Sequence, residues 1–188
     1  MRQRAPTPVL FTTDEYLHWE AGQAGRHEFV DGEIFSMAGA GDKHVTVTGN
    51  LYMALRQHLR GTPCRTLMLD TKVKVALSNS FFYPDLLVTC SLRDTFDSLV
   101  KREPKLIVEV LSPSTANYDR TDKFAAYRQL ESLEEYGLID IANRRADVYR
   151  RSPDGSWTLN PFDSGQGVAF ASVDLAIHAE TIFAEVFD

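Results

Sequence analysis

Short runs of apolar and β-branched residues, separated by polar breaks, constrain the fold of this sequence more than any other feature. Such runs are typical of strands, and they occur at residues 64–69, 72–77, 82–89, 106–111, 136–141, 146–150 and 157–159. Apolar residues recur at helical spacing from Val47 to Leu59, up to Gly61, and again at Phe124, Tyr127 and Leu130. Interleaved strands and helices predict the α/β class, with a mixed sheet flanked by helices.

Both ends of the chain are expected to add smaller elements. Thr12 or Thr13 can cap a short helix that ends near Gly22. Asp31 and Gly32 suit a two-residue turn with positive φ, so residues 27–37 predict an N-terminal hairpin extension. A short helix at residues 181–185 is expected to close the fold. Because the chain has 188 residues and no repeat, residues 1–188 are expected to form a single domain.

Composition excludes several classes of protein. Apolar residues make up 44% and charged residues 24% of the chain, which excludes disordered and collagen-like proteins. The apolar runs are too short for a membrane helix, and the N-terminus lacks the apolar core of a secretory signal, so we expect a cytoplasmic protein. Cys64 and Cys90 lie in apolar stretches without a C-x-x-C motif, which favours buried reduced thiols over a disulfide or a zinc site.

A formal net charge of −6 argues against a surface uniformly covered by phosphate-binding residues, but it leaves room for a local basic groove. Basic residues gather in three places: Arg56, Arg60 and Arg65; Lys101, Arg102 and Lys105; and Arg144, Arg145, Arg150 and Arg151. For each cluster taken alone, a solvated face is the simplest interpretation.

Two carboxylates interrupt apolar runs that are expected to be strands, Asp85 in residues 82–89 and Glu109 in residues 106–111. If the two strands pair antiparallel with a register centred near Asp97, Asp85 stands opposite Glu109, with Cβ atoms about 5 Å apart. Such a pair is costly unless the carboxylates share a proton or bind a hard cation, Mg²⁺ or Mn²⁺. The alternative is that Asp85 caps a strand and Glu109 pairs with an arginine.

A lysine near such a pair could orient an attacking water and stabilise developing negative charge. Lys123 lies in the helix expected after the Glu109 strand, with Asp119 four residues before it. The competing interpretation is an exposed lysine that only pairs with Asp119. Lys72 and Lys74, which alternate with valines on a neighbouring strand, are competitors for the same role.

Several segments together resemble the Uma-two family, a bacterial family of putative restriction endonucleases. The matching segments are residues 26–33, 37–39, 83–85 and 107–115, with His44 and Asn50–Leu51. The family is grouped with the PD-(D/E)XK nucleases, and the resemblance runs from about Thr12 to the end of the chain. It implies a restriction-endonuclease-like fold.

The resemblance also implies roles for particular residues. The Pro-Asp of the superfamily falls on Pro84 and Asp85, its second acid falls on Glu109, and the carbonyl of Val110 completes the metal ligands. The superfamily lysine normally stands two places after the second acid, where this chain has Leu111. Families of this kind often take the lysine from the following helix instead, and residues 119–123 resemble the Uma-two version of that segment, which makes Lys123 the candidate here.

Glu28 matches the acid of the family's first hairpin, and it would either bind the metal or orient a ligand; its alternative is a strand carboxylate that faces solvent. His44 and Asn50 match family positions, but a cap or packing role is the simpler interpretation. Ser112 and Ser114 are expected to cap the next helix, with a phosphate contact as the second choice.

These observations lead to the hypothesis of a Mg²⁺-dependent endonuclease, with Mn²⁺ as a substitute, that hydrolyses phosphodiester bonds in DNA. Asp85 and Glu109 would hold the ion and Lys123 would orient the water. A homodimer is expected because cutting both strands of a duplex needs two sites. The alternatives are a decayed nuclease fold that binds nucleic acid or protein without cutting, and a nuclease that acts on RNA or a structured junction.

Overall fold

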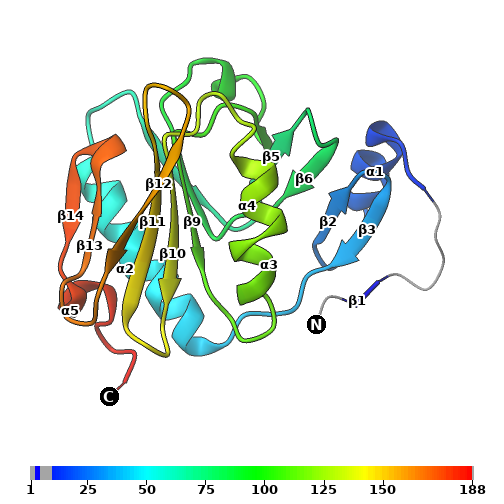
Figure 1. Cartoon of the computed structure of the whole chain (residues 1–188). Helices are drawn as coiled ribbons and strands as arrows, with labels where there is room; N and C mark the ends of the chain where they lie inside the picture. Colours follow the sequence, from blue (N-terminus) through cyan, green and yellow to red (C-terminus); the bar gives the residue numbers. More distant parts are fainter. Residues whose placement is uncertain (1–2, 5–9, 188) are drawn as a thin grey trace.

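The computed structural model describes residues 3–4 and 10–187, which form an α/β fold of strands flanked by helices (Figure 1). The helices are α1 (Thr13–Glu20), α2 (Asp42–His58), α3 (Ala116–Arg120), α4 (Asp122–Tyr127) and α5 (Ala179–Ile182). The strands divide between two six-stranded sheets and a small hairpin of β13 (Val168–Phe170) and β14 (Leu175–Ile177). The α/β class is confirmed, but the structure has two large sheets where a single mixed sheet was expected.

The sheet that we call the main sheet has the strand order β12-β11-β10-β9-β7-β4. Its strands are β4 (Arg65–Met68), β7 (Leu86–Thr89), β9 (Leu106–Val110), β10 (Glu135–Asp140), β11 (Arg145–Arg151) and β12 (Trp157–Phe162). Strands β9 and β10 are parallel, and the other pairs are antiparallel. Helix α2 covers one face of this sheet, and α3 and α4 cover the other (Figure 1).

The second sheet, here the N-terminal sheet, has the order β1-β3-β2-β6-β5-β8. Its strands are β1 (Gln3–Arg4), β2 (His27–Val30), β3 (Glu33–Ser36), β5 (Lys72–Val75), β6 (Ser80–Phe82) and β8 (Val100–Lys101). The predicted hairpin is confirmed: β2 pairs with β3 around Asp31 (φ 46°) and Gly32 (φ 92°). Strand β2 also pairs with β6, and β3 pairs with β1, so the hairpin lies within a larger sheet.

Residues 82–89, expected as one strand, are broken between the two sheets. Strand β6 ends at Phe82 in the N-terminal sheet, and β7 begins at Leu86 in the main sheet. The break falls at Tyr83, Pro84 and Asp85. Proline has no N–H for a ladder and restricts the residue before it, so Pro84 suits a crossing between sheets. The Pro-Asp segment therefore joins the two sheets.

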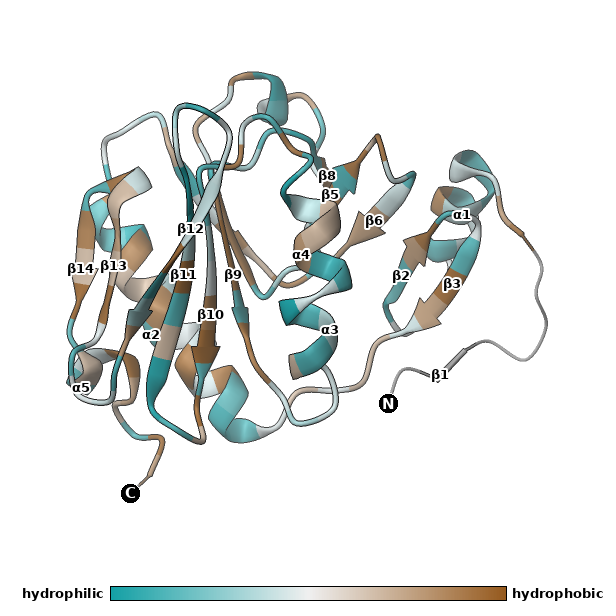
Figure 2. Ribbon diagram, in the orientation of Figure 1, coloured by the Kyte–Doolittle hydropathy of each residue, from teal (hydrophilic) through white to brown (hydrophobic). Residues whose placement is uncertain are grey.

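The alternation of side chains along β9 distributes them between two hydrophobic clusters. Leu106, Val108 and Val110 pack with α2, whereas Ile107 packs with residues of α4. Figure 2 shows hydrophobic residues along β9 and β10 in the middle of the main sheet. With a period of two, Glu109 belongs to the face that α4 covers.

Helix boundaries agree with the sequence in part. Thr12 caps α1 through a capping box with Glu15, as its position predicts. The helix after β9 is divided into α3 and α4 at Thr121, whose φ and ψ of −117° and −90° are not helical. The last helix, α5, begins two residues before the expected range and ends at Ile182.

Within residues 3–4 and 10–187, no helix has both the length and the apolar character needed to cross a membrane. The longest one, α2, has 17 residues and contains charged side chains.

The expectation of reduced cysteines is wrong, because Cys64 and Cys90 form a disulfide. Strands β4 and β7 pair antiparallel with Arg65 opposite Thr89, so the next cross-strand position brings Cys64 opposite Cys90. Their Cα atoms are 3.9 Å apart. Spacing along the chain gave no sign of this bond, because it depends on the register of two strands.

The disulfide closes a loop with a sequence separation of 26 residues. We predict that the double variant Cys64→Ser/Cys90→Ser lowers the free energy of unfolding by about 3 kcal/mol, since the unfolded chain gains entropy. Urea denaturation measures this loss. A reductant should lower the stability of the unsubstituted protein by a similar amount and leave the double variant unchanged; an unsubstituted protein that is insensitive to reductant would contradict the bond.

Candidate active site

Asp85 and Glu109 stand opposite each other, as the predicted antiparallel register requires. Leu86 pairs with Val108, so the next pair beyond β7 is Asp85 and Glu109. The Asp85 N–H donates to Glu109 Oε2 at 3.2 Å, and the Val110 N–H donates to Asp85 Oδ2 at 2.7 Å. Glu109 is buried, whereas the Asp85 side chain is 24% exposed. The pair thus has a closed side at Glu109 and an accessible side at Asp85.

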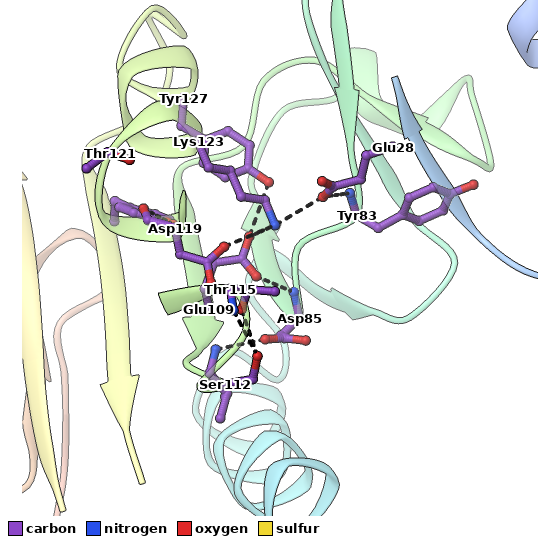
Figure 3. Close-up of polar contacts among 12 residues, drawn as sticks. Glu28, Tyr83, Asp85, Glu109, Ser112, Thr115, Asp119, Thr121, Lys123 and Tyr127 are labelled. Atoms are coloured by element: carbon purple, nitrogen blue, oxygen red, sulfur yellow. Dashed lines mark hydrogen bonds and ion pairs between the residues drawn. The ribbon is translucent and has the colours of Figure 1, made fainter. Parts of the chain in front are cut away.

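Lys123 reaches this pair from α4. Its Nζ lies 2.8 Å from Glu109 Oε1, 3.1 Å from Glu28 Oε1 and 3.7 Å from Asp119 Oδ1. The lysine is 5% exposed, so the interpretation of an exposed residue paired only with Asp119 is wrong. Figure 3 shows Glu28, Glu109 and Lys123 pointing toward one another.

The competing lysines lie elsewhere. The ammonium of Lys72 lies over the ring of Tyr83, at 4.9 Å from its centroid, and that of Lys74 lies over the ring of Phe81, at 5.4 Å. Glu109 contacts Lys123 rather than an arginine. Among the described lysines, Lys123 is therefore the one that contacts the Glu109 carboxylate.

Glu28 brings the N-terminal sheet to the site. It lies on β2, is 5% exposed and accepts a hydrogen bond from the Tyr83 N–H at 3.4 Å, so the solvent-facing alternative is wrong. The backbone N–H groups on both sides of Pro84 thus donate to carboxylates that also contact Lys123. This arrangement fixes the crossing between the two sheets.

Negative charge exceeds positive charge in this cluster. Glu28, Glu109 and Asp119 are buried around one buried lysine, and Asp85 adjoins them. Burial raises the pKa of the Glu109 carboxyl well above its usual range, although the Lys123 ammonium opposes this. Burial alone would lower the pKa of Lys123, but Glu109, Glu28 and Asp119 outweigh it and raise that pKa. Lys123 is therefore a cation, and the surplus negative charge suits a proton or a further cation.

The donor set fits a hard divalent ion. Among the described residues, no three His, Cys, Asp or Glu side chains are grouped closely enough to hold a metal by themselves. Mg²⁺ is commonly bound through one or two carboxylates, with waters and substrate phosphates as its other ligands. Asp85 and Glu109 supply two carboxylates beside the backbone of Val110, which is enough for an ion that completes its shell with substrate.

His44 is a site residue whose contact the sequence did not reveal. Its Nε2 lies 2.8 Å from Asp85 Oδ1, and it belongs to the first turn of α2. Burial lowers the pKa of His44, but the hydrogen bond and charge of Asp85 outweigh it and raise that pKa. The two residues are 41 positions apart, so only the family resemblance singled out His44. Asp85 is held on one oxygen by His44 and on the other by Val110.

Asn50, Ser112 and Ser114 have structural contacts. The Asn50 amide donates to the carbonyls of Ile182 and Ala184, which fixes the C-terminal segment on α2. Ser112 Oγ accepts from the Thr115 N–H at 3.3 Å and also contacts the Ser114 hydroxyl. Ser112 therefore stabilises the turn before α3, but the expectation that Ser112 and Ser114 cap this helix is wrong, because its N-cap residue is Thr115, whose side chain makes no capping hydrogen bond.

We predict that Lys123→Met lowers the free energy of unfolding by about 3–5 kcal/mol, because it leaves buried carboxylates without a counter-charge. The matched control is Lys74→Met, which removes a lysine whose ammonium lies over an aromatic ring and which should cost about 1 kcal/mol or less. Urea denaturation gives both values.

Adding Glu28→Gln to Lys123→Met should recover part of the loss, since one uncompensated charge disappears. Equal costs for Lys123→Met and Lys74→Met, with no coupling to Glu28, would show that the ion pairs do not stabilise the fold.

Known proteins resemble the chain in sequence. Residues 13–178 match the Uma2 family, described as "Putative restriction endonuclease". Two relatives come from Synechocystis sp., and both carry the name "Uncharacterized protein". The first, slr1290, is 33% identical over 179 residues, which cover 95% of this chain and 94% of the relative. The second, sll1609, is 35% identical over 155 residues, covering 81% and 88%.

A solved structure resembles the chain in fold. It is the crystal structure of a putative nuclease belonging to DUF820 from Anabaena variabilis, with a TM-score of 0.77. The match covers 93% of this chain and 98% of the other, at 17% sequence identity. This likeness supports the arrangement of sheets and helices.

Proposed function

The chain belongs to the Uma2 family, and we propose that it is a nuclease that uses Mg²⁺ or Mn²⁺ to hydrolyse phosphodiester bonds in DNA. The observation that carries this proposal is the meeting of Asp85, Glu109 and Lys123 at the junction of two sheets. Two opposed carboxylates supply ligands for an ion, and a buried lysine 2.8 Å from one of them supplies a fixed positive charge beside it.

Asp85 and Glu109 are the proposed ligands, together with the carbonyl of Val110. When bound, a divalent ion supplies a Lewis acid for the phosphate and lowers the pKa of water. The chain holds these carboxylates in place. The His44 ring and the Val110 N–H each contact one oxygen of Asp85, and the Asp85 N–H donates to Glu109. A rotationally fixed carboxylate loses little freedom when it binds, which favours catalysis.

Lys123 is the proposed group that orients the attacking water and stabilises negative charge on the phosphate. Its contacts with Glu109 and Glu28 hold the ammonium beside the acidic pair and keep it protonated. Because Glu28 contacts Lys123 and the Tyr83 N–H, we assign to Glu28 the task of orienting the lysine.

The proposal extends to the setting of the reaction. DNA as substrate implies a protein that acts in the cytoplasm, where bacterial DNA lies. A homodimer would supply two sites for the two strands of a duplex. One domain formed by residues 1–188 would then present one site per copy.

The test is incubation of the purified protein with supercoiled, linear and single-stranded DNA, with and without Mg²⁺ or Mn²⁺. We predict cutting that requires the ion and falls at least about 100-fold in Asp85→Asn, because that variant loses a charged ligand. The matched control is Asp163→Asn, an equal change at an exposed loop residue, which should cut at the unsubstituted rate.

Equal cutting by Asp85→Asn and Asp163→Asn would point to a contaminating nuclease and refute the assignment of the site. A protein that binds DNA but stays inert with both ions would favour the non-cutting module, and cutting of RNA alone would correct the substrate.

A further inference from the structure

A polyanion that approaches this site meets an excess of negative charge. The chain has a formal net charge of −6, and the carboxylates around Lys123 outnumber it. Nucleic-acid affinity comes largely from Lys and Arg that neutralise phosphates. Binding therefore requires cations near the site that carboxylates of the protein do not already neutralise.

Several arginines of the chain already have an acidic partner. Arg120 and Arg145 both contact Asp147, at 2.6 and 3.0 Å. Arg26 pairs with Asp70. These three arginines are compensated within the protein, so each would have to break an ion pair in order to bind a phosphate.

Lys43 and Arg144 differ from them. Within the described residues, no carboxylate lies at ion-pair distance from either side chain, and both are exposed. They pack instead on the ring of Phe187, with Lys43 Nζ 4.9 Å and Arg144 Cζ 3.9 Å from its centroid. The aromatic ring holds two positive groups side by side without neutralising them.

The topology puts this pair at the edge of the main sheet where the candidate site opens. Lys43 precedes His44, whose ring contacts the accessible carboxylate of Asp85. Strands β9 and β10 are parallel with Ile139 beside Val110, so the turn after β10 that carries Arg144 extends past the same edge. Figure 1 shows the start of α2, this turn and the C-terminal segment together at the lower edge of the molecule.

We propose that Lys43 and Arg144, held on the Phe187 ring, form a binding site for the phosphodiester backbone of DNA beside the Asp85–Glu109 pair. The site contacts phosphates that flank the one to be cut, and it acts independently of base sequence. This inference rests on the proposed nuclease function, but it concerns binding rather than cutting.

The experiment measures binding of a fluorescein-labelled DNA duplex by anisotropy, in the absence of divalent ions, over a series of salt concentrations. The double variant Lys43→Ala/Arg144→Ala should bind about 10-fold more weakly at low salt. The slope of log K against log salt should become shallower by about 2, because two phosphate contacts are lost. A labelled RNA strand of equal length serves as a second probe.

The matched control is Arg56→Ala/Arg60→Ala, which removes the same charge at and just beyond the other end of α2 and should leave the slope unchanged. Phe187→Ala keeps both charges but removes the ring on which the two side chains pack. It should therefore weaken DNA binding while the salt slope stays near that of the unsubstituted protein. Circular dichroism verifies that each variant is folded.

An equal loss in the two double variants would mean that only net charge matters and would overturn the proposal. So would an unchanged slope in Lys43→Ala/Arg144→Ala, absence of DNA binding by the unsubstituted protein, or binding of the RNA strand alone. Failure of the nuclease proposal is distinguishable from failure of this one. If the unsubstituted protein binds DNA but never cuts it, and Lys43→Ala/Arg144→Ala still binds more weakly with a shallower salt slope, only the nuclease proposal fails.

Discussion

The ion pairs of Lys123 are the interaction on which the rest of the structure depends. One buried ammonium from α4 contacts Glu109 of the main sheet and Glu28 of the N-terminal sheet. Removing such a charge from water costs several kcal/mol, and only close, hydrogen-bonded partners compensate this cost. The two carboxylates also accept the backbone N–H groups that flank Pro84. The same contacts therefore join two sheets, orient a helix and assemble the candidate site.

The location of the site follows from this junction. The chain leaves the N-terminal sheet at Phe82 and enters the main sheet at Leu86, and the proline between them ends one ladder before the next begins. Asp85 thus lies at the start of a strand, where its side chain is partly exposed, while Glu109 lies within a strand and is buried. One acid can meet a substrate, and the other retains the lysine. The surplus of carboxylates supports the proposed binding of a divalent ion, and the cations that we propose for phosphate binding lie outside the cluster.

Much of this arrangement was predictable, because it depends on local patterns. The hypothesis that the two neighbouring strands pair antiparallel placed Asp85 opposite Glu109, and the Asp31–Gly32 turn identified the hairpin. Lys123 came from the family resemblance, since helical spacing alone favoured a pair with Asp119. The rest depends on contacts between distant segments. The Cys64–Cys90 bond depends on the register of β4 and β7, and the burial of Glu28 depends on how the two sheets pack. The contact of His44 with Asp85 depends on the position of α2. Short-range periodicity in the sequence carries no information about any of these three features.

The central claim is that Asp85 and Glu109 bind a divalent ion, and crystals grown with Mn²⁺ test it most directly. Anomalous diffraction locates manganese independently of any activity. The account predicts one strong peak in contact with carboxylate oxygens of Asp85 and Glu109 and with the carbonyl oxygen of Val110, and no peak at that position in Asp85→Asn crystals. Crystals with no manganese at the pair, or with manganese bound only at other residues, would contradict the account.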